Sequence, residues 1–262
     1  MRSNLTVIVP NYNKSEFLKK CVESIEAQSL KPEAVIIVDD GSTDDSRSVI
    51  DALTKTYPDV RAHYKPRNTG VSSTRNIGLS LADTEYITFI DADDTYCNTE
   101  KLALEMKLQQ EHGGDIIAYS VVNFLTADGR TKNKKKKREY YLQGNVRDDL
   151  IITRKWDSIM RDYIVRTDTL KKAGGYNEAH SLYEDYELLL VLARDHEFYC
   201  TGEYGTAYRE GAGLSSADRH LQEQAQQEIV ESELARDDAK HRRSLLGRRK
   251  WRLLRRRIRN LI

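Results

Sequence analysis

The sequence predicts an α/β fold with a mostly parallel central sheet, flanking helices and a helical, basic C-terminal extension. Through about the first hundred residues, short apolar runs alternate with amphipathic stretches, which is the pattern of strand–helix–strand units. Acidic and polar clusters follow three of the predicted strands, and ligands collect at the carboxyl ends of strands in such sheets. Residues 240–262 then carry 11 Lys and Arg and no acidic side chain.

Length and composition limit the class of protein. The 262 residues allow one large domain or two small ones. Three cysteines, none in a Cys-x-x-Cys pair, argue against a disulfide framework and favour a reducing compartment. No run approaches the roughly 18 apolar residues of a membrane span, and the N-terminus has no apolar signal core. We therefore expect a cytoplasmic protein, or one attached to a membrane without crossing it.

The N-terminal elements are predicted in order from their periodicity. Leu5–Val9 is an apolar run closed by Pro10, as in a buried strand. The apolar positions from Phe17 to Ile25 recur at helical spacing. The same two periods then predict strands at 34–38, 61–64 and 86–90, a helix near 49–53 that stops before Pro58, and a helix at 71–82.

Beyond about residue 111 the pattern is weaker. Residues 115–125 form a strand-like run, 182–193 carry leucines at helical spacing, and the chain from 216 onward is polar, then basic, and helical throughout. Lys132–Arg138 holds six cations in seven residues. We interpret this run as a solvated hairpin tip, with contact to lipid phosphates or an anionic acceptor as the alternative.

Three carboxylates follow the strand predicted at 86–90, namely Asp91, Asp93 and Asp94. Like charges this close repel, so the cluster requires a compensating charge. Solvated loop acids, caps of the next helix and ligands of a hard divalent cation all fit the spacing. Because the cluster ends a buried strand, we favour Mg²⁺ or Mn²⁺, which bind carboxylates and complete their coordination with water and substrate phosphates.

Two further polar segments follow neighbouring elements. Asp39–Asp44 contains Gly41, which permits a tight turn. This segment is either a capped strand-to-helix loop or a site where carboxylates accept hydrogen bonds from ribose hydroxyls or a base imide. In 68–78, Gly70 permits close backbone approach, and Arg75 offers a planar fork to phosphate or a base carbonyl. The chain contains neither a Walker loop nor a Rossmann fingerprint.

Five motifs, taken in order, resemble those of the family-2 glycosyltransferases of the GT-A fold. They are Val7-Ile-Val-Pro-Asn-Tyr-Asn13, Asp39-Asp-Gly-Ser-Thr-Asp44, Asn68-x-Gly-x-x-x-x-Arg-Asn-x-Gly78, Asp91-Ala-Asp-Asp94, and Gly174-Gly-Tyr-Asn-Glu178 followed by Glu184-Asp-Tyr-Glu187. The resemblance covers roughly residues 5–215. It implies a nucleotide-sugar-binding βαβ half at 1–110 and an acceptor-binding half of the same domain at 111–215. The helical, basic, amphipathic extension at 216–262 is predicted from its own composition and pattern.

The resemblance also implies roles for single residues. They are Pro10, Tyr12 and Asp40 for the base and ribose, Arg75 for the base or diphosphate, Asp91 for the nucleotide and Asp93 for a metal ion. The metal would be Mn²⁺ or Mg²⁺, bridging the diphosphate of the donor. Bound there, it would act as a Lewis acid and stabilise charge on the departing nucleotide.

By the same resemblance, Asp185 is the general base that takes the proton of an acceptor hydroxyl, because it matches the second residue of the family's Glu-Asp motif. One-step attack would invert the anomeric configuration. From the residues alone, we would instead favour an acidic helix start at Glu184–Glu187, where the carboxylates interact favourably with the helix dipole. One departure is Gly211, which stands where many family members carry a His of the metal shell. We therefore expect no metal ligand from 208–216.

The C-terminal extension contrasts in charge with the rest of the chain. Residues 1–239 hold 31 basic and 41 acidic side chains, a net charge of −10, whereas the whole chain carries +1. On a helical wheel, five residues form one apolar arc that lies beside arginines. They are Trp251, Leu254, Ile258, Leu261 and Ile262. This pattern is typical of a helix that lies on an anionic bilayer. A packed helix with a solvated face and a coiled-coil partner are alternatives. Nucleic acid is not expected, because the acidic body would repel it.

These observations predict an inverting, metal-dependent glycosyltransferase that moves a sugar from a nucleoside-diphosphate donor, by family frequency a UDP-sugar, to a hydroxyl of a glycan or lipid-linked acceptor. Cell-envelope polysaccharide synthesis on the inner face of the cell membrane would suit the basic tail. Two alternatives are open. A sugar nucleotidyltransferase would favour a Gly-x-Gly-Thr-Arg loop, which this chain lacks. The other is a non-catalytic polyanion- or membrane-binding module with a relic sugar-nucleotide site.

Overall fold

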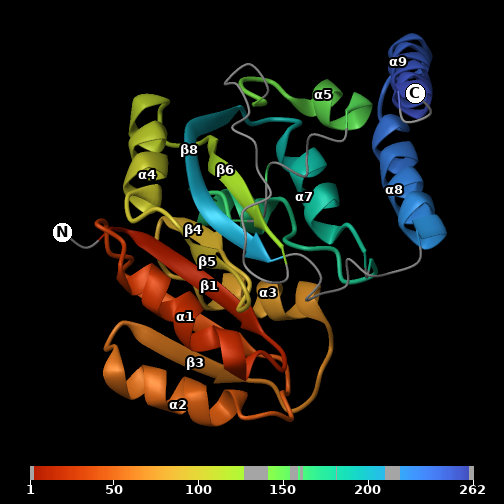
Figure 1. Ribbon diagram of the computed structural model, residues 1–262. Helices are drawn as coiled ribbons and strands as arrows, with labels where there is room; N and C mark the ends of the chain where they lie inside the picture. Colours follow the sequence, from red (N-terminus) through yellow and green to blue (C-terminus); the bar gives the residue numbers. More distant parts are fainter. Residues whose placement is uncertain are drawn as a thin grey trace.

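The computed structural model describes residues 3–126, 141–153, 159, 162–180, 182–209 and 219–259. The lysine-rich run 132–138 lies outside this part of the chain. Figure 1 shows the arrangement of the helices and strands. The helices are α1 (Ser15–Glu26), α2 (Ser46–Thr56), α3 (Val71–Leu81), α4 (Lys101–Glu111), α5 (Arg147–Ile152), α6 (Thr167–Lys172), α7 (Glu184–Leu192), α8 (Arg219–Leu234) and α9 (Ala239–Arg259). The strands are β1 (Leu5–Asn11), β2 (Ala34–Asp39), β3 (Val60–Tyr64), β4 (Tyr86–Phe89), β5 (Thr95–Tyr96), β6 (Ile117–Leu125), β7 (Val165–Arg166) and β8 (Phe198–Arg209).

The first sheet confirms the predicted parallel α/β fold. Its strand order is β3-β2-β1-β4-β7. The strand β1 runs parallel to both β2 and β4, whereas β7 joins β4 antiparallel at the edge. Because β1, β2 and β4 are parallel neighbours, their carboxyl ends lie side by side at one edge of the sheet.

Alternating side chains of β1 explain why helices cover both faces of this sheet. Val7 and Val9 lie in a core cluster with apolar residues of α1 and α2. Ile8 lies in the other cluster, which includes Leu79 of α3. The helix α3 comes close to β1 at Gly78, where a Cβ atom would lie 2.4 Å from Ile8 Cγ2. A glycine at this position therefore allows α3 to approach the sheet.

The second sheet has the order β5-β8-β6 and connects the two predicted halves of the domain. The strand β5, from residues 1–110, pairs antiparallel with β8. In return β7, from residues 111–215, pairs with β4 in the first sheet. The strand β6 runs parallel to β8. Each half thus contributes a strand to the other's sheet, and the two form one continuous body.

The strand β1 continues through Pro10 to Asn11, whereas the sequence predicts a strand that ends at Val9. Ile8 and Pro10 are two residues apart, so their backbone polar groups are directed to the same side of β1. On that side, which faces β4, the Ile8 carbonyl accepts a hydrogen bond from Ile90 N. The strand β4 ends opposite Ile8. The ladder between β1 and β4 therefore stops where Pro10 has no N–H to donate, and β1 continues beyond this point as a partner of β2 alone.

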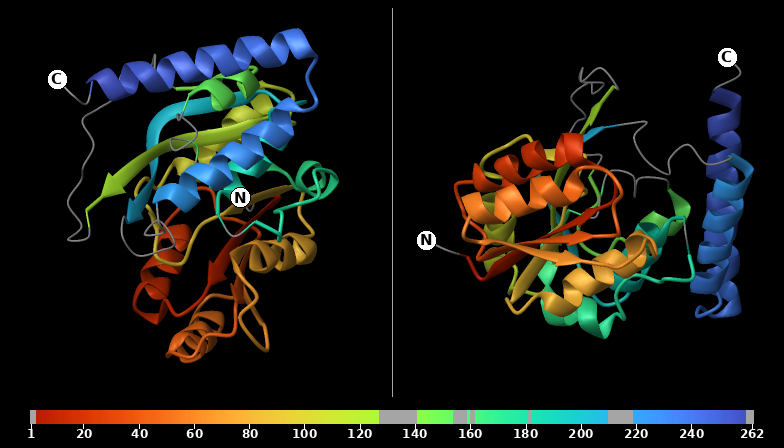
Figure 2. Two further views of the ribbon diagram at one scale, coloured as in Figure 1. Left: turned by 90° about the vertical axis from the view of Figure 1, so that its right-hand side faces the viewer. Right: turned by 90° about the horizontal axis from the view of Figure 1, so that it is seen from below.

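The helices α8 and α9 lie together on one side of the molecule (Figure 2). Ile229, Val230 and Leu234 of α8 and Leu245 of α9 are buried in the same core cluster as the leucines of α7. The predicted continuous helix is interrupted at 235–238, because Asp238 Oδ1 caps α9 by accepting hydrogen bonds from the backbone N–H groups of residues 240 and 241. In the part of the chain that the structure describes, no helix is both long and apolar enough to cross a bilayer.

Candidate active site

Polar side chains gather where β1 and β2 end. Asn11 lies opposite Asp39 in the sheet and donates a hydrogen bond of 2.8 Å from Nδ2 to Asp39 Oδ1. Pro10 is buried within β1, whereas Tyr12, just beyond the strand, is 43% exposed. An exposed aromatic ring offers an apolar surface, and carboxylates at a strand end offer hydrogen-bond acceptors. Base or ribose contacts of Pro10 and Tyr12 stay predictions.

Asp40 holds the loop that leads from β3 into α3. Its side chain lies 2.6 Å from Lys65 Nζ and is 4% exposed. Its two oxygens also accept hydrogen bonds from the backbone N–H groups of 69–70, at 2.9 and 3.0 Å. Gly41 next to it has φ +69, and a Cβ there would lie 2.6 Å from the Arg67 carbonyl carbon. The acid and the glycine therefore shape this loop, and the contact of Asp40 with a base or ribose stays a prediction.

The three carboxylates that follow β4 come together. One oxygen from each of Asp91, Asp93 and Asp94 lies within 4.8 Å of the others. Lys14 Nζ lies 2.7 Å from Asp93 Oδ2, and Arg75 Nη2 lies 3.0 Å from Asp91 Oδ1. These two side-chain cations thus compensate part of the negative charge of the cluster. The sequence predicts a metal ion as the compensating charge.

This cluster has the chemistry of a Mn²⁺ or Mg²⁺ site. All three groups are carboxylates, the hard oxygen ligands that these cations take. Asp91 and Asp93 are half-buried, and Asp94 is buried. Burial, followed by the charge of Asp94, raises the pKa of the nearby Cys21 thiol well above its ordinary value. Cys21 therefore stays protonated and adds no thiolate ligand.

Arg75 of α3 connects the carboxylates after β4 to the start of α7. Its Nη2 donates a hydrogen bond of 3.0 Å to Asp91 Oδ1, and its Nη1 donates one of 2.7 Å to Glu184 Oε1. The guanidinium is nearly fully buried, with Cζ 5.1 Å from the centre of the Tyr176 ring. A planar guanidinium can bind two carboxylates at once, which an ammonium group does poorly. The contact of Arg75 with a base or diphosphate stays a prediction.

Asn76, the next residue, holds the Gly174–Glu178 motif against α3. Its Oδ1 accepts a hydrogen bond from Tyr176 N, and its Nδ2 donates one to Tyr176 O, both at 2.8 Å. Gly175 has φ +70, and a Cβ there would lie 2.5 Å from Asn76 Oδ1. The adjacent residues Arg75 and Asn76 therefore bind two parts of the motif that the resemblance assigns to the acceptor side.

Asp185 lies in the first turn of α7. Its side chain is half-buried, and its Oδ1 accepts a hydrogen bond of 2.8 Å from Tyr186 N. Two acids near it in the sequence have other partners. Glu184 pairs with Arg75, and Glu187 Oε2 lies 2.7 Å from His180 Nδ1. The structure thus brings Asp185 next to the residue that Arg75 holds, and its role as a base stays a prediction.

Three side chains of this region are not predicted from the sequence as parts of the site, namely Lys14, Asn76 and Glu184. Each lies within or beside a motif, but its hydrogen-bond partner is distant in the chain. The partner lies 79 residues away for Lys14, 100 for Asn76 and 109 for Glu184. No local pattern indicates such pairings. Gly211, which replaces the His of the metal shell in many family members, lies outside the described residues.

Comparison with known proteins gives the same family by sequence. The chain is 34% identical over 129 residues to the glycosyltransferase GlyG of Streptococcus pneumoniae, covering 49% of this chain and 42% of that protein. It is 30% identical over 191 residues to the teichoic acid poly(glycerol phosphate) polymerase of Staphylococcus epidermidis, covering 72% of this chain and 26% of that protein. The chain thus spans less than half the length of these curated relatives.

Solved structures confirm the predicted GT-A fold. TarS of S. aureus (residues 1–349, in complex with UDP-GlcNAc) superposes with a TM-score of 0.71 at 19% identity, covering 95% of this chain and 71% of that chain. The mannosyltransferase PcManGT of Pyrobaculum calidifontis, in complex with GDP-Man and Mn²⁺, gives a TM-score of 0.64 at 18% identity, covering 90% and 64%.

The family model described as glycosyl transferase family 2 matches residues 6–169, which is well over half of the chain and includes four of the five motifs. The resemblance seen in the sequence is therefore confirmed, and the chain belongs to glycosyl transferase family 2.

Proposed function

We propose that this chain transfers a sugar from a nucleoside-diphosphate donor to a hydroxyl group of a glycan or lipid-linked acceptor, with inversion at the anomeric carbon. One observation carries this proposal. The single guanidinium of Arg75 bonds to Asp91, on the predicted donor side, and to Glu184, which adjoins the predicted base Asp185. These bonds support one site in which the donor diphosphate and the acceptor hydroxyl meet.

The donor would lie across the ends of β1, β2 and β4, and a UDP-sugar is the first choice. TarS was solved with UDP-GlcNAc and PcManGT with GDP-Man, so structures of this fold accept more than one nucleotide. The exposed ring of Tyr12, with Pro10 and Asp40 beside it, would hold the base and ribose, and Asp91 would contact the nucleotide.

Asp93 would hold Mn²⁺ or Mg²⁺, with the other two carboxylates of its cluster within reach. When bound, the metal supplies positive charge that stabilises the departing nucleoside diphosphate. Lys14, 2.7 Å from Asp93 Oδ2, would hold this carboxylate in place. The chain would therefore assist the departure of the nucleotide by placing charged side chains around the diphosphate.

Asp185 would accept the proton of the attacking hydroxyl. Its position on the first turn of α7 is supported by the hydrogen bond from Tyr186 N and by the neighbouring bond between Glu184 and Arg75. Attack would come from the face of the sugar opposite the departing nucleotide. A single displacement of this kind inverts the anomeric configuration.

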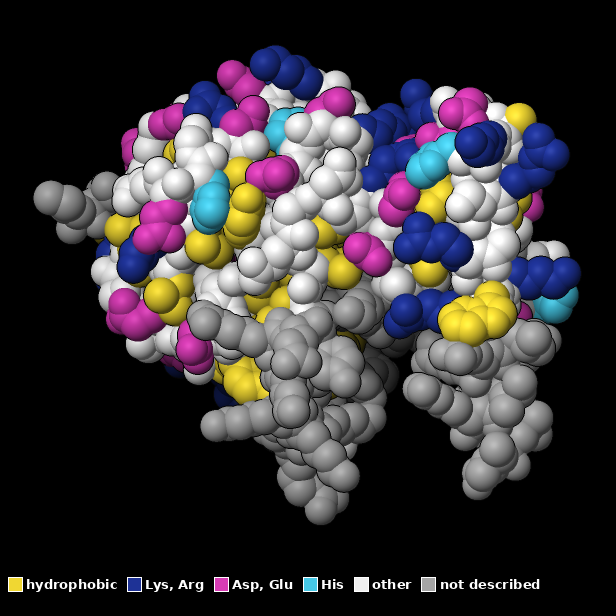
Figure 3. All heavy atoms as spheres, turned by 90° about the horizontal axis from the view of Figure 1, so that it is seen from above, with side chains coloured by type: hydrophobic (Ala, Val, Ile, Leu, Met, Phe, Trp, Pro, Cys, Tyr) yellow, Lys and Arg dark blue, Asp and Glu magenta, His cyan; other side chains and the backbone are white. Residues whose placement is uncertain are grey.

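We also propose that the acceptor belongs to a cell-envelope polymer and that α9 holds the enzyme at an anionic membrane surface, on the inner face of the cell membrane. The name of one curated relative, a teichoic acid poly(glycerol phosphate) polymerase, supports the first part. For the second, Leu245 of α9 is buried against the body while Trp251 is 55% exposed. Six residues correspond to about 240° around a helix, so Trp251 lies on the side away from Leu245. Figure 3 shows Lys and Arg side chains gathered over this side of the molecule.

A donor screen tests this proposal. UDP- and GDP-sugars are added with Mn²⁺, and both the melting temperature and nucleotide release are measured, because a ligand that binds the folded state raises its melting temperature. At least one UDP-sugar should stabilise the wild type and be turned over. Asp93→Asn should lose the metal-dependent part of both signals, whereas Asp83→Asn, an exposed acid elsewhere, should keep them. Equal behaviour of the two variants would exclude Asp93 as the metal ligand.

A further inference from the structure

The helix α8 is joined to α7 by side chains at both ends. Near the start of α7, the Tyr183 hydroxyl donates a hydrogen bond of 3.3 Å to Gln222 Oε1 on α8. Just past the end of α7, Arg194 Nε donates one of 3.1 Å to Glu233 Oε2. The two joins are 11 residues apart in both segments, from 183 to 194 and from 222 to 233. The helices α7 and α8 therefore run in the same direction, and side chains join them at the two ends of α7.

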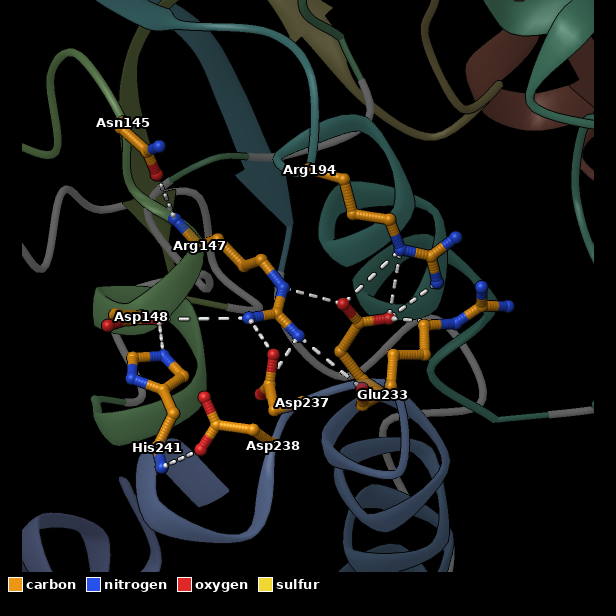
Figure 4. Close-up of polar contacts among 9 residues, drawn as sticks. Asn145, Arg147, Asp148, Arg194, Glu233, Asp237, Asp238 and His241 are labelled. Carbon is orange, nitrogen blue, oxygen red and sulfur yellow. Dashed lines mark hydrogen bonds and ion pairs between the residues drawn. The ribbon is translucent and has the colours of Figure 1, made fainter. Parts of the chain in front are cut away.

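The join at the end of α7 is a buried cluster of charges (Figure 4). Glu233 has a side chain that is 3% exposed and lies between Arg194 and Arg147 of α5. Arg147 Nη1 also lies 3.1 Å from Asp237 Oδ1, beyond the end of α8. Paired buried charges are costly to separate, so this cluster fixes one end of α8 against both α5 and α7.

The join at the start of α7 involves a residue with an unusual backbone. Tyr183 has φ 62 and ψ 25, in the left-handed region that residues other than Gly, Asn and Asp rarely adopt. Its ring packs against the core cluster, and its hydroxyl reaches α8. Tyr183 directly precedes Glu184 and Asp185, so its backbone conformation sets the direction in which both side chains leave the helix. Such conformations persist where surrounding contacts hold them.

We propose that α8 is a positioning element for the predicted base, and that Tyr183 and Gln222 are the positioning residues through which it acts. This inference rests on the proposed function, in which Asp185 takes a proton from the acceptor. The hydrogen bond that Tyr183 donates to Gln222 holds the Tyr183 turn. The turn directs Asp185 toward the acceptor, and the charge cluster at Glu233 keeps α8 in register with α7. The family match ends at residue 169, so all of these residues lie beyond it.

The test compares variants that remove this one bond and keep the fold. Gln222→Leu removes the acceptor, and Tyr183→Phe removes the hydroxyl while the ring stays packed. Gln224→Leu, on the exposed side of α8 two residues away, is the matched control, and Gln222→Glu restores an acceptor of the same shape. The readouts are steady-state release of UDP from the UDP-sugar chosen by the donor screen, and the Kd for UDP with Mn²⁺.

We expect kcat to fall by about 10-fold or more in Gln222→Leu and in Tyr183→Phe, because a small displacement of a catalytic group can cost up to about 100-fold. The Kd for UDP should stay within about two-fold of the wild-type value in both. Gln222→Glu should recover most of kcat, and the double variant should be no worse than the single variants, because both remove the same bond.

Two results would overturn the inference. One is a kcat of Gln222→Leu and Tyr183→Phe equal to that of Gln224→Leu. The other is a parallel loss of UDP binding and turnover, which would mean a general structural role for α8. Asp185→Asn, measured alongside, separates this inference from the proposed function. If Asp185→Asn is fully active, Asp185 is not the base and the proposed function fails. If it is inactive while the Gln222 and Tyr183 variants turn over normally, only the positioning role fails.

Discussion

Arg75 on α3 and Glu184 at the start of α7 are 109 residues apart in the chain, and a hydrogen bond of 2.7 Å joins Nη1 of one to Oε1 of the other. The same guanidinium also bonds to Asp91 at the end of β4. One residue thus sets the distance between the predicted donor side and the predicted base. Because the guanidinium is buried, neither water nor salt readily screens its contact with Glu184.

Arg75→Lys should show whether the planar geometry of the guanidinium matters beyond its positive charge. An ammonium group keeps the positive charge but cannot serve two carboxylates with fixed, in-plane donors. We expect a loss of stability of about 1–3 kcal/mol, as for a buried polar group that loses a partner, and a clear fall in turnover. Urea denaturation and nucleotide release measure the two effects. Arg61→Lys, at an exposed site on β3, should change neither, and a fully active Arg75→Lys would contradict the bridging role.

Gly78→Ala should destabilise the fold even though alanine favours helices. A Cβ at this position would lie 2.4 Å from Ile8 Cγ2 in the buried core, and overpacking of this kind costs about 1–3 kcal/mol. Gly247 in α9 has no neighbouring atom within 4 Å of such a Cβ, so Gly247→Ala should instead stabilise by up to about 1 kcal/mol. Chemical denaturation of both variants checks the opposite signs. A stabilising Gly78→Ala would show that α3 does not pack on β1 this closely.

The Glu233 cluster should make the docking of α8 sensitive to acid. Burial alone raises the pKa of the Glu233 carboxyl, but hydrogen bonds from Arg194 and Arg147 outweigh it and lower the pKa below its ordinary value of 4.5. A lowered pKa in the folded state means that this group stabilises the fold fully above about pH 4.5, and that the contribution is lost as the pH falls through the lowered value.

Glu233→Gln should therefore unfold more easily at pH 7, by about 3 kcal/mol as for a broken buried ion pair, and the difference from wild type should shrink below about pH 4.5. Denaturation curves at a series of pH values measure this difference. Glu228→Gln, an exposed acid on the same helix, serves as the control. A difference between Glu233→Gln and wild type that stays constant with pH would contradict the assignment.

Membrane binding through α9 is best tested with point variants. Removing residues 240–262 would also remove Leu245 from the core and Arg249, whose Nη1 donates a hydrogen bond of 2.7 Å to the Ile151 carbonyl. Trp251→Ala and Arg252→Gln change exposed side chains instead. Both should weaken binding to phosphatidylserine vesicles in a flotation assay, Arg252→Gln by about 1 kcal/mol. Arg61→Gln should bind as the wild type does, and equal binding by all variants would exclude α9 as the contact.

The sequence predicts this fold well wherever local chain chemistry decides it. The runs that form β1, β2 and β4 are largely apolar on both faces because helices cover both. The acids at the ends of β2 and β4 mark the edge where we propose that the donor binds. The strand β7 is only two residues long, so it carries no periodic signal, and its place in the first sheet depends on tertiary contacts. Glu233 illustrates the same limit within the site's surroundings. In the sequence it is one of several acids on a polar helix, and its burial depends on two arginines from distant segments.

The central claim, that the start of α7 supplies the base to a donor bound at the strand ends, is tested most directly by comparing donor binding with turnover in Asp185→Asn. The variant should bind the UDP-sugar and Mn²⁺ with the wild-type Kd, while turnover falls by roughly 10²- to 10⁴-fold, the usual contribution of a general base. Asp195→Asn, exposed just past the other end of α7, should retain both. Full turnover in Asp185→Asn, or loss of donor binding together with turnover, would contradict the account.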